Sequence, residues 1–263
     1  MQLWWGVARR TFRQKAAYPS AVLAGIFTNT MFGCVRAWVL LAVFAGRAQL
    51  GGYDATDAVT FTFLTQGLIM ATGGWNLGEL PERIRTGDIV LDLHRPVDLQ
   101  VWWLAADLGR SAFHLLARGM VPVAAGAVLF GLRWPSGPGA LALPLSVGLA
   151  ILVAFGLRFL LCMVCFWLLD ERGLNAVNGV VNLFLNGLLL PLVLFPAWLR
   201  GVALHLPWAM TMQVPADVWL GKHDGLAPMA RTLALQALWA GVLLAAGRLL
   251  MQRALHKVVV HGG

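Results

Sequence analysis

The sequence predicts an all-α, polytopic integral membrane protein with six transmembrane helices and an N-terminal amphipathic interfacial helix. Hydrophobic residues make up 59% of the chain and charged residues only 12%, and the mean hydropathy is +0.72. This composition leaves too little polar surface to cover a water-soluble globule of 263 residues. The chain also contains apolar runs of about 20 residues or more, the length that a helix needs to cross a hydrocarbon core about 30 Å thick.

The first predicted element is an amphipathic helix from Met1 to Lys15, within an interfacial segment of residues 1–18. At about 100° per residue, the aromatic residues Trp4 and Phe12 fall on one face and the arginines on the other. Tryptophan suits the headgroup zone of a bilayer, so we expect this helix to lie at the cytoplasmic interface.

Six apolar runs follow, separated by loops rich in glycine, proline and charge. Inside hydrocarbon every backbone polar group must be paired within the protein, so runs of this length indicate helices. We predict spans at Ala21 to Ala45, Ala58 to Leu77, Ser111 to Leu132, Ala140 to Leu169, Val177 to Leu199 and Met229 to Leu250. The first run is too long for a cleaved signal peptide and is interpreted as a retained signal anchor.

The placement of the basic residues decides how the formal net charge of +8 is interpreted. An even number of spans puts both termini on one side, and that side carries eleven basic residues outside the spans. The other side carries four: Arg47, Arg133, Arg200 and Lys222. This bias predicts cytoplasmic termini and leaves no basic stripe for nucleic acid. Seventeen arginines against three lysines are typical of a GC-rich bacterial genome, so we expect a multi-pass protein of the bacterial inner membrane.

Two loops carry more than a simple connection needs. Residues 79–98 are polar enough to leave the membrane, yet they include Ile84, Ile89 and Leu91, which a solvated linker would not need. Either a partner protein or the membrane helices of the chain itself should cover these side chains. Residues 200–227 are rich in tryptophan and proline, which predicts segments that lie in or dip into the outer interface.

Several catalytic motifs are missing from the sequence. It contains no G-x-x-x-x-G-K-[ST] loop, so the chain cannot hold nucleotide phosphates in the P-loop manner. It has no H-E-x-x-H zinc helix and no G-x-S-x-G nucleophile elbow, and its six histidines show no ligand spacing. We expect no enzyme activity, metal or cofactor in this chain, and any ATP-driven step must use another chain.

Polar residues within the predicted spans are the candidates for a translocation path. An arginine at a helix centre costs roughly 2.5 to 3.5 kcal/mol. Arg36 and Arg158 should therefore face the protein interior, a partner helix or water, unless they extend toward a headgroup region.

The neutral polar residues form two stripes, and both belong to the candidate path. Asn178, Asn182 and Asn186 recur every four residues on the fifth span, and Thr62 and Gln66 make a shorter stripe on the second. Such groups either bind helices together, at about 0.6 to 2 kcal/mol each, or line a path for a polar substrate. The sequence leaves both roles open.

Six spans, an amphipathic cytoplasmic helix leading into the first and a charged loop after the second resemble the permease subunits of ABC type-2 exporters. Two stretches carry the resemblance further: Ile84-Arg85-Thr86-Gly87-Asp88-Ile89 running to Leu93-His94-Arg95-Pro96-Val97, and Leu206-Pro207-Trp208 followed by Pro215 and Gly221. They resemble the branch of the ABC-2 family that includes viologen and other drug or natural-product exporters. The resemblance covers the chain in order and implies a single ABC type-2 transmembrane domain over residues 1–263.

The resemblance also implies partners and roles. Two permease chains, identical or homologous, would lie beside two cytoplasmic ATPases, which bind ATP and Mg. Residues 79–98 would carry the coupling region, and residues 200–227 would form short outer re-entrant helices. For contact with the ATPase we single out Arg83, Ile84, Arg85, Asp88, Ile89, Leu91 and Asp92.

The predicted function is therefore a permease subunit that moves a substrate out of the cytoplasm with ATP hydrolysed by another subunit. One alternative is an ion-coupled secondary transporter or channel, which would want acidic residues within its spans for a proton or cation relay. The acidic residues here fall in predicted loops or close to span ends. A membrane-embedded enzyme is a second alternative, and no motif supports it.

Overall fold

The computed structural model describes residues 2–74, 76–168, 171–223 and 225–261 of the chain. Within these ranges the regular elements are helices, and the sole β-bridge joins Leu50 and Tyr53. Four helical segments are long and apolar enough to cross a membrane: Pro19–Phe44, Leu99–Phe130, Gly137–Leu168 and Leu226–Leu255. The prediction of an all-α polytopic membrane protein is confirmed.

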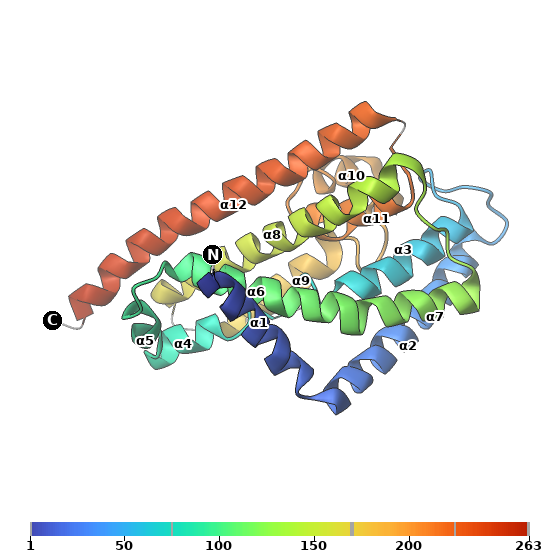
Figure 1. Ribbon diagram of the computed structural model, residues 1–263. Coiled ribbons are helices and arrows are strands. Elements are labelled where there is room, and N and C mark those ends of the chain that lie inside the picture. The colour runs from blue at the N-terminus through green and yellow to red at the C-terminus, as the bar shows by residue number, and fades with distance from the viewer. Residues whose placement is uncertain (1, 75, 169–170, 224, 262–263) are drawn as a thin grey trace.

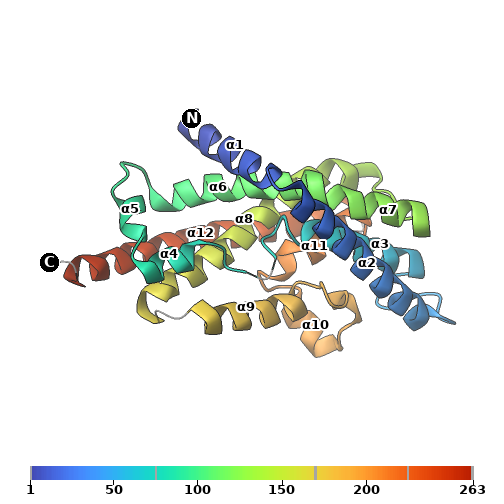
Figure 2. The same ribbon diagram turned by 90° about the horizontal axis from the view of Figure 1, so that it is seen from below.

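The four long segments set the shape of the molecule (Figure 1). They are α2 (Pro19–Phe44), the continuous run of α6 (Leu99–Phe113), η1 (His114–Gly119) and α7 (Met120–Phe130), then α8 (Gly137–Leu168) and α12 (Leu226–His261). α8 is the most buried of the four, and α12 runs beside it along one edge of the molecule (Figure 1). Seen from below, α1 and α6 lie on one side of this pair and α9 and α10 on the other (Figure 2).

Glycines and amides join α8 to α12. Gly156 and Gly247 leave room for Leu243 and Phe159, so the two helices pack closely. Near the other end Gln236 donates from Nε2 to the carbonyl of Ser146 at 2.9 Å. Small residues and side-chain amides are the usual means of joining helices in a bilayer.

The amphipathic start of the chain is a helix, α1 (Gln2–Ala16). It packs across α6, where a Cβ on Gly109 would overlap the backbone of Ala8. Phe12 meets Phe113 edge to face, with ring centroids 5.4 Å apart. The apolar face of α1 is therefore partly covered by the chain itself.

Two predicted spans are shorter helices. The second is α3 (Ala55–Leu68), with 14 residues, and the fifth is α9 (Glu171–Leu185), with 15 residues. Helices of that length reach roughly 21 to 23 Å, less than a hydrocarbon core of about 30 Å. The prediction of continuous helices over Ala58 to Leu77 and Val177 to Leu199 was wrong in its C-terminal halves, and the total of six spans stays a prediction.

Local residues explain where α3 and α9 end. After α3, Gly73 and Gly74 adopt φ values of +105° and +63°, in the left-handed region that favours glycine. After α9, the side-chain carbonyl of Asn186 accepts a hydrogen bond from the backbone N–H of Leu188 at 2.8 Å and so supports a turn. The chain continues through η2 (Leu192–Leu194) and α10 (Ala197–Ala203).

The third span begins twelve residues earlier than predicted, at Leu99 instead of Ser111. Asp98 caps it, because its carboxylate accepts from the N–H of Val101 at 3.0 Å. In the middle the helix widens to the π form at η1, where Gly119 meets Gly67 of α3 so closely that neither position has room for a side chain. Single-turn π segments of this kind are rare in helices.

The outer segment of residues 200–227 contains η3 (Ala209–Thr211) and α11 (Gln213–Trp219). Both pack against the membrane helices: a Cβ on Gly139 of α8 would lie 2.6 Å from the carbonyl of Val218. Short helices were implied for this segment by the resemblance, and their re-entrant placement in the bilayer remains a prediction.

Candidate coupling and translocation sites

The predicted coupling region folds as two short helices, α4 (Leu80–Thr86) and α5 (Ile89–Leu93). They lie beside the C-terminal ends of α8 and α12 (Figure 1). Gly87 joins them, with a φ of +83° that a residue with a side chain rarely adopts.

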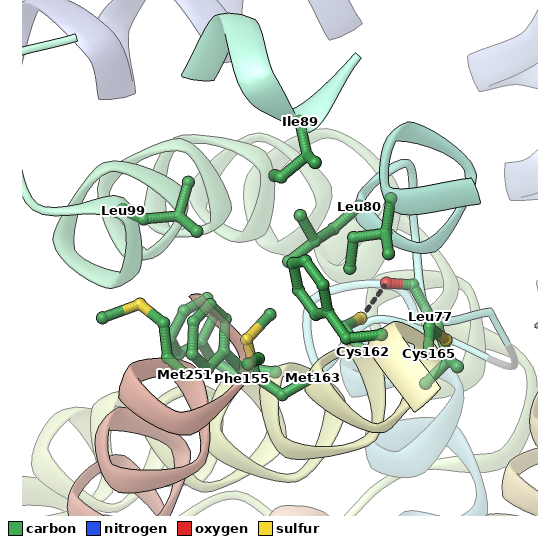
Figure 3. Close-up of a cluster of buried hydrophobic side chains, with 13 residues drawn as sticks. Leu77, Leu80, Ile89, Leu99, Phe155, Cys162, Met163, Cys165 and Met251 are labelled. Atoms are coloured by element: carbon green, nitrogen blue, oxygen red, sulfur yellow. Dashed lines mark hydrogen bonds between the residues drawn. The ribbon is translucent and has the colours of Figure 1, made fainter. Parts of the chain in front are cut away.

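The two isoleucines of this region point into the molecule. Ile84 and Ile89 are buried in a cluster with Leu80, Phe159 and Met163, to which α8 contributes most (Figure 3). The expectation that a partner covers them is corrected, because the chain's own helices do so. Leu91 is the exception, with 63% of its surface exposed.

The charged residues of this region also divide into buried and exposed ones. Asp92 is buried, accepts from Arg83 Nε at 2.8 Å and Nη2 at 3.1 Å, and lies 3.2 Å from Arg95 Nη1. A bidentate pair of this kind fixes α4 against α5. Arg85 and Asp88 are exposed and make only local contacts. Of the residues singled out for ATPase contact, Arg85, Asp88 and Leu91 face outward.

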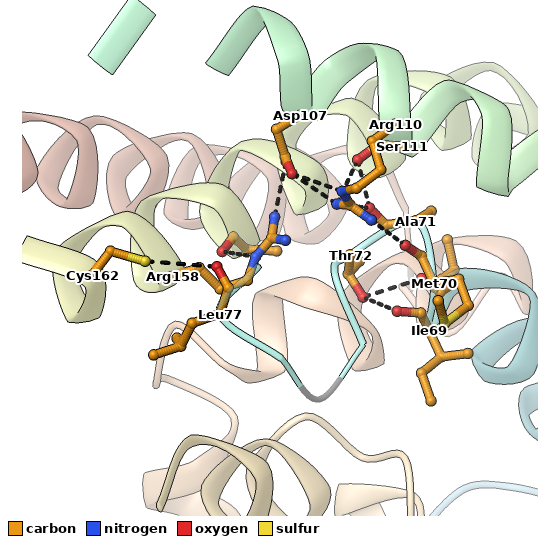
Figure 4. A network of polar contacts seen from close by, with 12 residues as sticks. Ile69, Met70, Ala71, Thr72, Leu77, Asp107, Arg110, Ser111, Arg158 and Cys162 are labelled. Carbon is orange, nitrogen blue, oxygen red and sulfur yellow. Dashed lines mark hydrogen bonds and ion pairs between the residues drawn. The ribbon is translucent and has the colours of Figure 1, made fainter. Parts of the chain in front are cut away.

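Behind the coupling region lies a buried ionic network that the sequence did not reveal (Figure 4). Asp107 on α6 lies between two arginines: Arg110 Nε is 2.9 Å from Oδ1, and Arg158 Nη2 on α8 is 2.9 Å from Oδ2. The side chains of Asp107 and Arg158 are each only 11% exposed. The sequence left several surroundings open for Arg158, among them the protein interior. Arg158 does face the interior, and there it forms an ion pair.

This network holds the irregular segment that follows α3. Arg110 donates from Nη1 to the carbonyl of Met70 at 2.6 Å, and Ser111 donates from Oγ to the carbonyl of Ala71 at 2.6 Å. The carbonyl of Met70 also accepts from the backbone N–H of Gly73 at 3.3 Å. The arginine adds a second donor there, and its positive charge suits the negative end of the helix dipole. A Cβ on Gly73 would overlap the guanidinium of Arg158.

The network and the coupling region border one cavity. Its volume is about 330 Å³, and its wall includes Arg83 and Asp92 from the coupling region together with Asp107 and Arg158. Further along the same connection, the N–H of Leu77 donates to Asn175 Oδ1 at 3.0 Å. The path from α3 to α4 is therefore held by three helices, α6, α8 and α9.

Asn182 of the asparagine stripe bonds to a residue of its own helix. Asn182 donates from Nδ2 to the backbone carbonyl of Asn178 at 2.8 Å and to its side chain at 2.7 Å. Asn178 and Asn186 are buried. These bonds support α9 and its end, and the path role of the stripe stays a prediction.

The other candidate path residues, Thr62, Gln66 and Arg36, lie on α3 and α2, and Asn29 of α2 donates to the backbone carbonyl of Gln66 at 3.4 Å. Thr62 is fully buried and donates to the carbonyl of Ala58 at 2.9 Å. Arg36 reaches Thr65 Oγ1 at 3.4 Å, and its Nε and Nη2 are buried without a hydrogen-bond partner. Arg36 thus faces α3, and buried donors of this kind are costly.

A second ionic cluster lies at the opposite end of the molecule, outside the four long helices. Asp57 on α3 is buried between Lys222, with which it forms an ion pair, and Arg133, whose Nη1 lies 3.0 Å away. Arg133 also meets Asp54 at 2.7 Å. These contacts join the loop after α11 and the loop after α7 to the start of α3.

Beside this cluster, Gln213 of α11 joins three elements. Its Nε2 donates to Tyr53 Oη at 3.0 Å and to Asp217 Oδ1 at 3.0 Å, and its Oε1 accepts from the N–H of Leu192 at 2.9 Å. Tyr53 donates to Asp217 as well. Burial raises the pKa of Asp217 to about 6, although Tyr53, Gln213 and Lys222 act in the opposite direction.

A family model described as "ABC-2 family transporter protein" matches residues 33–262, which is most of the chain. The chain belongs to the ABC-2 transporter family. A search of curated proteins gave no match. As a member of this family the chain is the membrane permease component of an ABC transporter, and the family implies a partner subunit that binds ATP.

The two ionic clusters of this ABC-2 permease were missed for the same reason. Asp107 and Asp57 were assigned to span ends, where an acidic residue needs no partner. For the Asp107 cluster the available signal was Arg158, because ionisable residues within spans often pair with one another. Among the described residues no group of three His, Cys, Asp or Glu side chains gathers at metal-binding distance.

Proposed function

We propose that this chain is the membrane-spanning subunit of an ABC exporter, which moves a substrate out of the cytoplasm with ATP hydrolysed by a separate subunit. Family membership supports the permease role. The sequence has no P-loop, so ATP and Mg would be bound by two cytoplasmic ATPase subunits, beside a second permease chain.

The distribution of charge supports an orientation with the coupling helices in the cytoplasm of a bacterial cell. The coupling helices α4 and α5 and the C-terminus lie at one end of the molecule, and the loops with Arg47, Arg133 and Lys222 lie at the other (Figure 1). The basic residues are more numerous on the former side, which is the cytoplasmic side by the positive-inside rule. Both termini are then cytoplasmic.

The observation that carries the proposal is the continuous connection from the coupling helices to α3. The bidentate pair of Arg83 and Asp92 fixes α4 to α5, and Arg110 holds the carbonyls that follow α3. A displacement of α4 by an ATPase would therefore be transmitted to the irregular segment, because packed elements move as units.

One observation favours the alternative of an ion-coupled transporter, because Asp107 lies within the apolar helical run Leu99–Phe130. This carboxylate, however, forms ion pairs with Arg110 and Arg158, each at 2.9 Å. The pair is better suited to a structural link.

Transport by the purified chain in proteoliposomes tests the proposal. The chain is reconstituted with its cognate ATPase, or with an ATPase variant whose Walker lysine is replaced. We expect uptake of a fluorescent drug panel into inside-out vesicles only with the active ATPase and ATP. Transport that is driven by a proton gradient without the ATPase would contradict the proposal.

A further inference from the structure

A second and larger cavity lies along the outside of the helical bundle. Its volume is about 1240 Å³. One wall is formed by α1 and by the run from α6 to α7, the other by the N-terminal half of α8, and residues of α3 and α11 also line it.

The cavity extends across the depth of a bilayer. Along the run from α6 to α7 it is lined from Ala105 to Ala124, a distance of roughly 28 Å at 1.5 Å per residue. This matches a hydrocarbon core of about 30 Å. Trp4 lies among the lining residues of α1. Trp134, in the loop after α7, packs against Trp219, at the end of α11, with ring centroids 5.9 Å apart.

Among the described residues that line the cavity, Arg9 is the one with a charged side chain, and the rest of the lining is apolar. A polar solute would find no hydrogen-bond partners along such a wall and would lose its hydration there. Tryptophan at both ends is typical of the two membrane interfaces. Arg9 is exposed on α1, near the same interface as Trp4 and Trp5.

We propose that this groove binds the acyl chains of an anionic phospholipid, whose headgroup phosphate pairs with Arg9. The acyl chains match the apolar wall, and the phosphate matches the single cation.

Native mass spectrometry of the purified chain tests this site, with phosphatidylglycerol and phosphatidylcholine as the probes. Gly148 lines the groove and has open space around it, so Gly148→Trp should fill it; Leu116→Trp is a second filling variant from the opposite wall. The matched control is Gly241→Trp, at an exposed glycine of α12 outside the groove with equally open surroundings. We expect both filling variants to lose most of the bound phosphatidylglycerol and the control to retain it.

The headgroup is tested separately with Arg9→Gln and its control Arg13→Gln, on the same helix but not in the lining. We expect Arg9→Gln to lower the preference for phosphatidylglycerol over phosphatidylcholine about fivefold, the factor expected of one basic residue near an anionic surface. Arg13→Gln should leave it unchanged. Equal lipid retention by the filling variants and by Gly241→Trp would overturn the proposal. So would filling variants that keep the bound lipid but lose a complex of two chains.

Discussion

Asp107 of α6 and Arg158 of α8 form a buried ion pair, with Arg158 Nη2 2.9 Å from Asp107 Oδ2, at the point where the chain leaves α3 as an irregular segment. Arg110 shares the same carboxylate and bonds the carbonyl of Met70. The pair therefore joins two long helices to the connection that leads toward the coupling helices. We propose on this basis that the pair helps to transmit movement between the coupling helices and α3.

Replacing Asp107 with Asn should destabilise the permease, because Arg110 and Arg158 would both lose their counter-charge. Breaking a buried pair by removing one partner costs about 3 to 5 kcal/mol in soluble proteins. Unfolding of Asp107→Asn, Arg158→Gln and the double variant in mild detergent gives a double-mutant cycle. We expect a double variant less destabilised than the sum of the single ones, and strict additivity would show that the pair contributes nothing.

Asn182→Leu distinguishes the two roles left open for the asparagine stripe. The side chain of Asn182 bonds mainly to Asn178 on its own helix, so its loss should cost assembly little. If the stripe lines the path, the transport rate falls while the yield of assembled complex stays at the level of the unchanged protein. A parallel loss of yield and transport would assign the stripe to helix binding.

Arg36→Met should raise the stability of the permease. Arg36 has one long hydrogen bond to Thr65 and buried guanidinium nitrogens without partners, and a side chain of similar length without charge removes that cost. We expect an unfolding midpoint above that of the unchanged chain, together with slower transport if Arg36 belongs to the path. A lower midpoint would mean that Arg36 has a stabilising partner in the assembled transporter.

The outer cluster predicts a pH dependence that centres on Asp217. Its pKa is raised from 3.8 to about 6, so between these values the folded state holds a proton that the unfolded state releases. The stability that this group contributes is therefore present at low pH and is lost as the pH rises through about 4 to 6. Two neighbouring charges also act on this pKa: Lys222 lowers it and Asp57 raises it.

Unfolding midpoints between pH 4 and pH 7 measure this dependence. Asp217→Asn should remove the part of the slope that belongs to this carboxyl group and leave the rest. Asp88→Asn, at an exposed carboxylate of the coupling region, is the control and should leave the slope unchanged. A slope that is the same in Asp217→Asn and in the unchanged chain would refute the assignment.

Hydrophobicity alone predicted the long helices well: α2 and α8 begin and end within three residues of their predicted spans. Hydrophobicity failed where polar tertiary contacts determine the conformation of the backbone. The run from Ile69 to Leu77 is apolar enough for a helix, but two glycines and the donors of Arg110 and Ser111 stabilise an irregular backbone there. A single sequence does not show which distant side chain satisfies a carbonyl.

The candidate coupling residues show the same limit. Their position between the second and third spans was correct, and their composition indicated a covered surface. Which side chains face inward depends on the turn at Gly87 and on the pairing of Asp92, neither of which has a periodic signal in so short a segment. Ile89 and Leu91 were therefore grouped together, although they face opposite surroundings.

We propose that α4 and α5 form the docking surface for an ATPase, and the variant Leu91→Asp tests this surface. Leu91 is exposed, so the change leaves the buried cluster intact; Val202→Asp, at an exposed apolar residue of α10, is the matched control. Removing a central apolar contact costs more than about 1 kcal/mol in many interfaces, and an added charge costs more. Binding of the ATPase to the permease in nanodiscs, with ATP hydrolysis as a second readout, should weaken at least about tenfold in Leu91→Asp and stay unchanged in Val202→Asp. Normal binding and stimulation of ATP hydrolysis by Leu91→Asp would contradict the account.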